Sequence, residues 1–161
     1  MNVKGFARYL LASILGAAIF VALSARQGNA EPLGGKEKLA NPVFHFEIPV
    51  TDIDRAVRFY EVVLGTKLTR RTVDGYEMAF FPRSDGAPGA SGALAKGEVY
   101  VPSKAGAIIY FDVPEIDTVL ERAKTQGADI LYPKTHTGDD GYVAEIEDSE
   151  GNRIALTSTG K

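Results

Sequence analysis

The sequence predicts an α+β fold built from two βαβββ modules in tandem, at about residues 42–104 and 105–158. The first observation is that the same order of short strand-like and helix-like runs occurs twice along the chain. The second is that a shift of 63 residues superposes three pairs of residues: Val50 on Val113, Ile53 on Ile116 and Asp54 on Asp117. Self-similarity of this kind is typical of a duplicated supersecondary unit.

In the first module, alternation of apolar and polar residues predicts a strand over Val43–Ile48. Apolar residues at helical spacing then predict a helix over about Ile53–Leu64, which ends at Gly65. Thr51 followed by Asp54 resembles a capping box at the start of this helix. Three further strands complete the module: Lys67–Thr72, Tyr76–Phe81 and Ser91–Ala95.

The second module repeats this order. A strand is expected over Ala107–Val113, and a helical stripe runs from Ile116 to Ala123 and closes at Gly127. Three strands follow: Asp129–Tyr132, Tyr142–Glu147 and Arg153–Ser158. Residues 159–161 form a short tail, and His136 is expected in a loop away from the sheet face of interest.

Residues 1–30 have the pattern of a secretory signal peptide. Lys4 and Arg8 precede the uncharged run Tyr9–Ala25, and small residues surround the expected cleavage point after Ala30. Cleavage there predicts a periplasmic or secreted protein. The alternative is an uncleaved membrane anchor, and this leader is the only membrane contact that we expect. Residues 31–41, with a proline and two adjacent glycines, are expected to be a flexible lead-in.

The charge and cysteine content exclude several functions. The net charge is −3, and removal of the leader, which holds three basic residues and no acidic ones, leaves 15 basic against 21 acidic residues, a net charge of −6. An acidic protein of this kind is not expected to bind nucleic acid and favours neutral or cationic small molecules. The chain has no cysteine, which excludes a thiolate nucleophile and a cysteine-ligated metal.

Three segments resemble the vicinal oxygen chelate superfamily, which includes glyoxalase I, bleomycin-resistance proteins and extradiol dioxygenases. They are His45–Val50 (HFEIPV), Asp52–Gly65 (DIDRAVRFYEVVLG) and the turn Asp148–Asn152 (DSEGN), where Ser149 replaces the usual proline. The resemblance covers about residues 42–158. It implies a cup-shaped, partly open mixed sheet with the helices outside and a small-molecule site in the cup. It also implies a homodimer as the expected assembly.

The resemblance also implies four metal-ligand positions, on the first and last strand of each module. Aligned through the repeat, they fall on His45, Gly92, Ile108 and Ala155. Only His45 can bind a metal, whereas a catalytic metal site usually needs three protein ligands. We therefore expect no cofactor; zinc, nickel, manganese or iron would bind only if the true register differs from this one.

Alternation along the strands places further side chains in the expected cup. His45 and Glu47 lie on one face of the first strand, with Cβ atoms about 7 Å apart, and are candidates for an acid–base pair. The alternative is a buried, hydrogen-bonded pair that only stabilises the sheet. Tyr110, Arg153 and Thr157 are the candidate ligand-binding residues of the second module.

Two functions follow. The first is an exported protein that binds or sequesters a small molecule without the full metal site of the superfamily. The alternative is a lyase or isomerase related to lactoylglutathione lyase, acting on a small oxygenated substrate through His45 and Glu47. Whether the protein is an enzyme stays open at this point.

Overall fold

The computed structural model describes residues 42–138 and 141–159. The expected signal peptide (residues 1–30), the lead-in (31–41) and the last two residues of the tail lie outside the described residues. Among the described residues, no helix is both long enough and apolar enough to cross a membrane.

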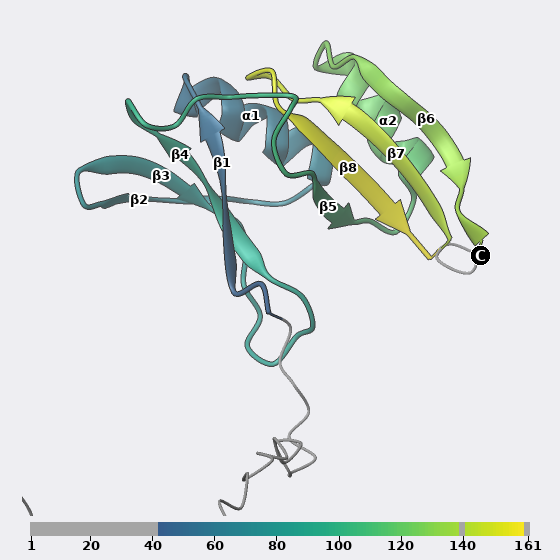
Figure 1. Cartoon of the computed structure of the whole chain (residues 1–161), viewed down its shortest axis with the longest axis horizontal. Coiled ribbons are helices and arrows are strands. Elements are labelled where there is room, and N and C mark those ends of the chain that lie inside the picture. The colour runs from purple at the N-terminus through teal and green to yellow at the C-terminus, as the bar shows by residue number, and fades with distance from the viewer. Residues whose placement is uncertain (1–41, 139–140, 160–161) are drawn as a thin grey trace, which may run out of the picture. The chain divides into compact units, whose positions relative to one another are not determined.

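The predicted duplication is confirmed, because both halves of the described chain have the order strand, helix, strand, strand, strand (Figure 1). The first module comprises β1 (His45–Val50), α1 (Ile53–Leu64), β2 (Thr69–Val73), β3 (Tyr76–Phe80) and β4 (Ser91–Lys96). The second comprises β5 (Ile109–Asp112), α2 (Ile116–Thr125), β6 (Ile130–His136), β7 (Tyr142–Glu147) and β8 (Arg153–Ser158).

Each module forms its own four-stranded mixed sheet, with the orders β1-β4-β3-β2 and β5-β8-β7-β6. In both sheets the first strand pairs in parallel with the last strand of its module, and the remaining pairs are antiparallel. The sheets have the same topology but are not joined by a strand pair, so the described strands form two sheets and no closed barrel.

Helix α1 has the predicted bounds but a different cap. The Asp52 carboxylate accepts hydrogen bonds from the backbone N–H groups of Asp54 and Arg55, both at 3.0 Å, so Asp52 is the N-cap. The expected capping by Thr51 is therefore wrong, because the Thr51 side chain bonds to another part of the chain. The helix ends at Gly65, whose φ of 66° lies in the left-handed region that favours glycine.

One hydrophobic core joins the two modules. It includes Ile48 and Leu94 from the first sheet, Leu156 from the second, and Tyr60 and Val119 from the two helices. Helix α1 packs on β3 and β4, α2 packs on β6, β7 and β8, and the helices contact each other. The helices thus cover one face of each sheet. We call the other faces the first and second open faces.

Strand β6 differs most from its prediction. It extends to His136 rather than Tyr132, so His136 ends a strand instead of lying in a loop. Pro133 cannot donate a backbone hydrogen bond, and the register with β7 shifts between Ile130 and Tyr132 and again between Tyr132 and Thr135, across the proline. The irregularity allows the strand to continue past a residue that would otherwise end it.

Candidate functional site

The first open face carries His45 and Glu47. Their neighbours Phe46 and Ile48 pack into or against the core, so alternation along β1 turns His45 and Glu47 away from the helices. The register of the parallel pair aligns His45 with Ser91 of β4 and Glu47 with Ala93. The predicted position of both residues on a single sheet face is therefore what the structure shows.

His45 and Glu47 are close but only partly buried. His45 Nε2 lies 3.6 Å from Glu47 Oε1, and about a third of each side chain is exposed (35% and 36%). The Tyr100 hydroxyl donates a 2.7 Å hydrogen bond to Glu47 Oε2, and this bond is the main reason why the pKa of Tyr100 is raised. The alternative of a buried, hydrogen-bonded pair is thus wrong, because 3.6 Å exceeds a hydrogen bond and solvent reaches both groups.

Aromatic rings surround this pair. Tyr76, Phe80 and Tyr100 pack against Met78 of β3 and two alanines of β4, and we call these three rings the aromatic platform. The Tyr76 and Tyr100 rings meet edge to face at 5.4 Å, and the His45 ring lies 6.2 Å from that of Phe80. The Arg71 guanidinium stands 3.9 Å from the centroid of Phe80. Arg71 therefore covers one face of the Phe80 ring.

The second open face brings together the three predicted ligand-binding residues. Tyr110 aligns with Ala155 in the β5–β8 pair, and Arg153 and Thr157 flank Ala155 at spacings of two. Tyr110 is 54% exposed, which leaves its ring and hydroxyl free to meet a ligand. Arg153 is paired with the carboxylate of Glu145, its Nε donating at 2.8 Å, so it contributes hydrogen bonds with little net charge.

One of the four implied metal positions was assigned to the wrong face. A Cβ atom at Gly92 would meet the Phe46 carbonyl oxygen at 2.2 Å and the Phe46 ring at 2.4 Å, so Gly92 points toward the helices. Phe46 aligns with Gly92 and Ile109 with Ile154, which makes the repeat offset 63 for the first strands but 62 for the last. Ala93 therefore takes the place of Gly92 on the open face.

With this correction, the residues at the four positions are His45, Ala93, Ile108 and Ala155. One imidazole and three hydrocarbon side chains do not fit a three-ligand metal site. Within residues 42–138 and 141–159, no group of three or more histidine, aspartate or glutamate side chains is arranged to hold a metal ion.

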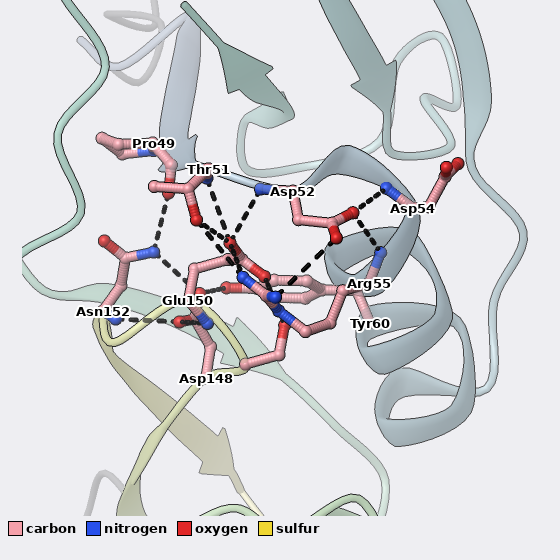
Figure 2. Close-up of polar contacts among 10 residues, drawn as sticks. Pro49, Thr51, Asp52, Asp54, Arg55, Tyr60, Asp148, Glu150 and Asn152 are labelled. Atoms are coloured by element: carbon pink, nitrogen blue, oxygen red, sulfur yellow. Dashed lines mark hydrogen bonds and ion pairs between the residues drawn. The ribbon is translucent and has the colours of Figure 1, made fainter.

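A hydrogen-bonded clasp fixes the position of one module relative to the other (Figure 2). Glu150, from the turn between β7 and β8, accepts from the backbone N–H groups of Thr51 and Asp52 at 3.0 Å and from the Thr51 hydroxyl at 2.8 Å. Arg55 of α1 donates to both Glu150 oxygens, at 2.8 and 2.9 Å. Burial alone would raise the pKa of Glu150, but these hydrogen bonds outweigh it and lower the pKa.

The buried half of the clasp centres on Asp148. Its carboxylate accepts from the Tyr60 hydroxyl at 2.7 Å and from the Asn152 side chain at 2.8 Å, and also from the backbone N–H groups of Glu150 and Asn152. Asn152 in turn donates to the Pro49 carbonyl at 2.9 Å. Burial and the neighbouring Asp148 raise the pKa of Tyr60 well above its ordinary value, so its hydroxyl remains a donor.

The sequence did not indicate this clasp. Arg55 has the appearance of a solvated helix residue, and its partner Glu150 lies 95 positions away along the chain. The turn Asp148–Asn152 was singled out only for its resemblance to a family motif. The structure shows what its acidic and amide side chains do: they join the end of β1 and helix α1 to the second module.

The described elements thus define a protein of two tandem βαβββ modules, each with one open sheet face. The chain belongs to the Glyoxalase/Bleomycin resistance protein/Dioxygenase superfamily, whose family model matches residues 43–156. The predicted superfamily is therefore confirmed. No curated protein matches the sequence as a relative.

Several solved structures share the fold. A glyoxalase I variant from Zea mays matches with a TM-score of 0.59 at 22% identity over 73% of this chain; this chain spans about half of it (46%). TnmS3, an antibiotic-binding protein from Streptomyces sp. CB03234, matches with a TM-score of 0.58 at 21% identity, covering 73% of this chain and 95% of that one. A glyoxylase/bleomycin resistance protein/dioxygenase domain from Frankia sp. EAN1pec matches with a TM-score of 0.58 at 20% identity, over 74% of this chain and 98% of the other.

Proposed function

We propose that this protein binds a small, flat, neutral or cationic molecule on its open faces without transforming it. The observation that carries the proposal is the aromatic platform of Tyr76, Phe80 and Tyr100 beside the Glu47 carboxylate. Rings supply stacking area, and the carboxylate, together with the acidic character of the chain, favours a positively charged ligand. The fold shared with an antibiotic-binding protein supports the same assignment.

The donor set also supports binding over metal-dependent catalysis, since His45 is the one metal-binding side chain at the four family positions. Tyr110, Arg153 and Thr157 would hydrogen-bond the ligand from the second open face.

We propose that two copies of the chain form a homodimer, as the family resemblance implies. Light scattering on the purified protein measures this directly.

Metal-free bleomycin is a suitable first probe, because it is cationic and carries flat aromatic rings. We expect saturable binding by isothermal titration calorimetry, with a Kd that rises about 3- to 10-fold in Phe80→Ala through loss of stacking. Phe44→Ala is the matched control, because Phe44 is 72% exposed but lies outside the aromatic platform. The Kd of this variant for bleomycin should equal that of the unaltered protein. Equal weakening by both variants would argue against the platform as the binding surface.

The second candidate function is a glyoxalase-like lyase or isomerase, favoured by the 3.6 Å approach of His45 to Glu47. The hemithioacetal of methylglyoxal and glutathione is the substrate to assay. Turnover that disappears in His45→Ala, with an unchanged circular dichroism spectrum, would replace the binding assignment by the enzymatic one. Titration of the unaltered protein and of His45→Ala with zinc, nickel, manganese and ferrous ions would show whether His45 binds a metal.

We also propose that the chain is exported and cleaved after Ala30. The expected result of expressing the full chain in a bacterium is a periplasmic or secreted product whose intact mass corresponds to residues 31–161. Ala30→Phe places a large side chain at the cleavage point and should leave the leader attached. A product that keeps residues 1–30 in the unaltered chain would instead identify the leader as an anchor.

A further inference from the structure

A cavity of about 450 Å³ is lined by residues of both modules. Of the predicted ligand-binding residues it includes Tyr110 but neither His45 nor Glu47. Its lining comes from β1, the end of α1, the connection from β3 to β4, β5 with the residues after it, and α2. Phe46 and Phe111 of this lining pack against the hydrophobic core, on the face opposite the open faces. The volume falls within the range of small-molecule sites, about 300–1,000 Å³.

Three aromatic rings form one wall of this cavity. The ring centroids of Phe46, Phe81 and Phe111 lie 5.5–6.0 Å from one another, and all three residues line the cavity. Pro82 and Pro88 add flat, rigid apolar surface from the connection before β4. Such a wall recognises a flat hydrocarbon body by contact area and has few polar groups to desolvate.

Arg122 of α2 supplies the contrasting polar group. Its Nε donates to the Thr118 carbonyl at 3.4 Å, and its Nη1 lies where a Cβ on Gly65 would be only 2.7 Å away. Because Gly65 has no side chain, the guanidinium reaches the C-terminal end of α1, whose free carbonyl groups stabilise a cation. Among the described residues, no carboxylate lies within ion-pair distance of Arg122; Asp112 lines the same cavity beyond that distance.

We infer that this cavity is a second binding site, specific for a small aromatic carboxylate. The ring of the ligand packs on Phe46, Phe81 and Phe111, and its carboxylate accepts hydrogen bonds from the Arg122 guanidinium. Tyr110 lines this cavity and also lies on the second open face, so the two sites are neighbours. They differ in the charge of their ligands, because Arg122 favours an anion and the Glu47 carboxylate favours a cation. The charge of Arg122 is available to a ligand because no ion pair with a described carboxylate neutralises it.

The test compares 2-naphthoate with 2-naphthamide, which has the same rings and no charge. We expect 2-naphthoate to bind in the cavity about tenfold more tightly than 2-naphthamide, with each affinity taken from the shifts of cavity residues in an NMR titration. The methyl signals of Val113 and Val119, which line the cavity, should shift during the titration. Equal affinity for the two probes, no binding of either, or shifts confined to other residues would overturn the inference without any variant being needed.

Two variants locate the charge. Arg122→Gln should reduce the preference for 2-naphthoate over 2-naphthamide to within about twofold, since it removes the cation and keeps a polar, uncharged side chain. Phe80→Ala, on the aromatic platform, should leave the affinity for 2-naphthoate unchanged. If instead Phe80→Ala abolishes binding and Arg122→Gln does not, the carboxylate binds on the open face and the second site is wrong.

Discussion

Replacing Asp148 by alanine is expected to destabilise the protein by about 3–5 kcal/mol, a large part of the stability of an ordinary domain. Asp148 is 5% exposed and accepts four hydrogen bonds. Its removal leaves the fully buried Tyr60 hydroxyl and the N–H groups of the turn without their acceptor, and each unsatisfied buried donor costs about 1–3 kcal/mol. The free energy of unfolding from urea titration measures the effect.

Asp85→Ala is the matched control, because Asp85 is exposed in the connection between β3 and β4; its unfolding free energy should change by less than about 0.5 kcal/mol. Tyr60→Phe removes only the hydroxyl donor and should cost about 1–3 kcal/mol. In the double variant, the loss of unfolding free energy should be smaller than the sum of the two single losses, since both substitutions remove the same hydrogen bond. Additive losses would mean that Tyr60 and Asp148 stabilise the fold independently.

The elements that were predicted well carry strong local signals. Helix α1 has apolar residues at helical spacing and a glycine at its end, and its predicted bounds agree with the structure. Strands β7 and β8 alternate between core and open face and were also placed correctly. Strand β6 was predicted too short because Pro133 resembles a strand end, whereas a shift of register against β7 accommodates it.

The candidate site was predictable to the level of the sheet face but not to the level of contacts. Alternation along the strands, combined with the sheet arrangement that the family resemblance implies, assigns His45, Glu47, Tyr110, Arg153 and Thr157 to the open faces. The clasp could not be predicted, since Tyr60 and Asp148 are 88 positions apart and only packing of the two modules brings them together. The cavity lined by Arg122 could not be predicted for the same reason, because its walls come from five separate segments of the chain.

The misplacement of Gly92 has a specific cause. The connections between the strands differ in length in the two modules, so the repeat offset is 63 for the first strands but 62 for the last. In a strand, a slip of one residue moves every side chain to the opposite face. As a result, a metal position was assigned to Gly92, which faces the hydrophobic core and not the open face.

Gly92→Ala distinguishes the two registers and is expected to lower the free energy of unfolding by about 1–3 kcal/mol. The added methyl group would lie 2.2 Å from the Phe46 carbonyl oxygen, which is backbone and cannot rotate away, so β1 and β4 must separate. Gly106→Ala, where no atom lies within 4 Å of the added carbon, should be nearly neutral. Thermal and urea unfolding of the two variants compare them directly. If Gly92 pointed to the open face, alanine would be tolerated there as it is at Ala93, and an unchanged stability would restore the register with Gly92 among the four family positions.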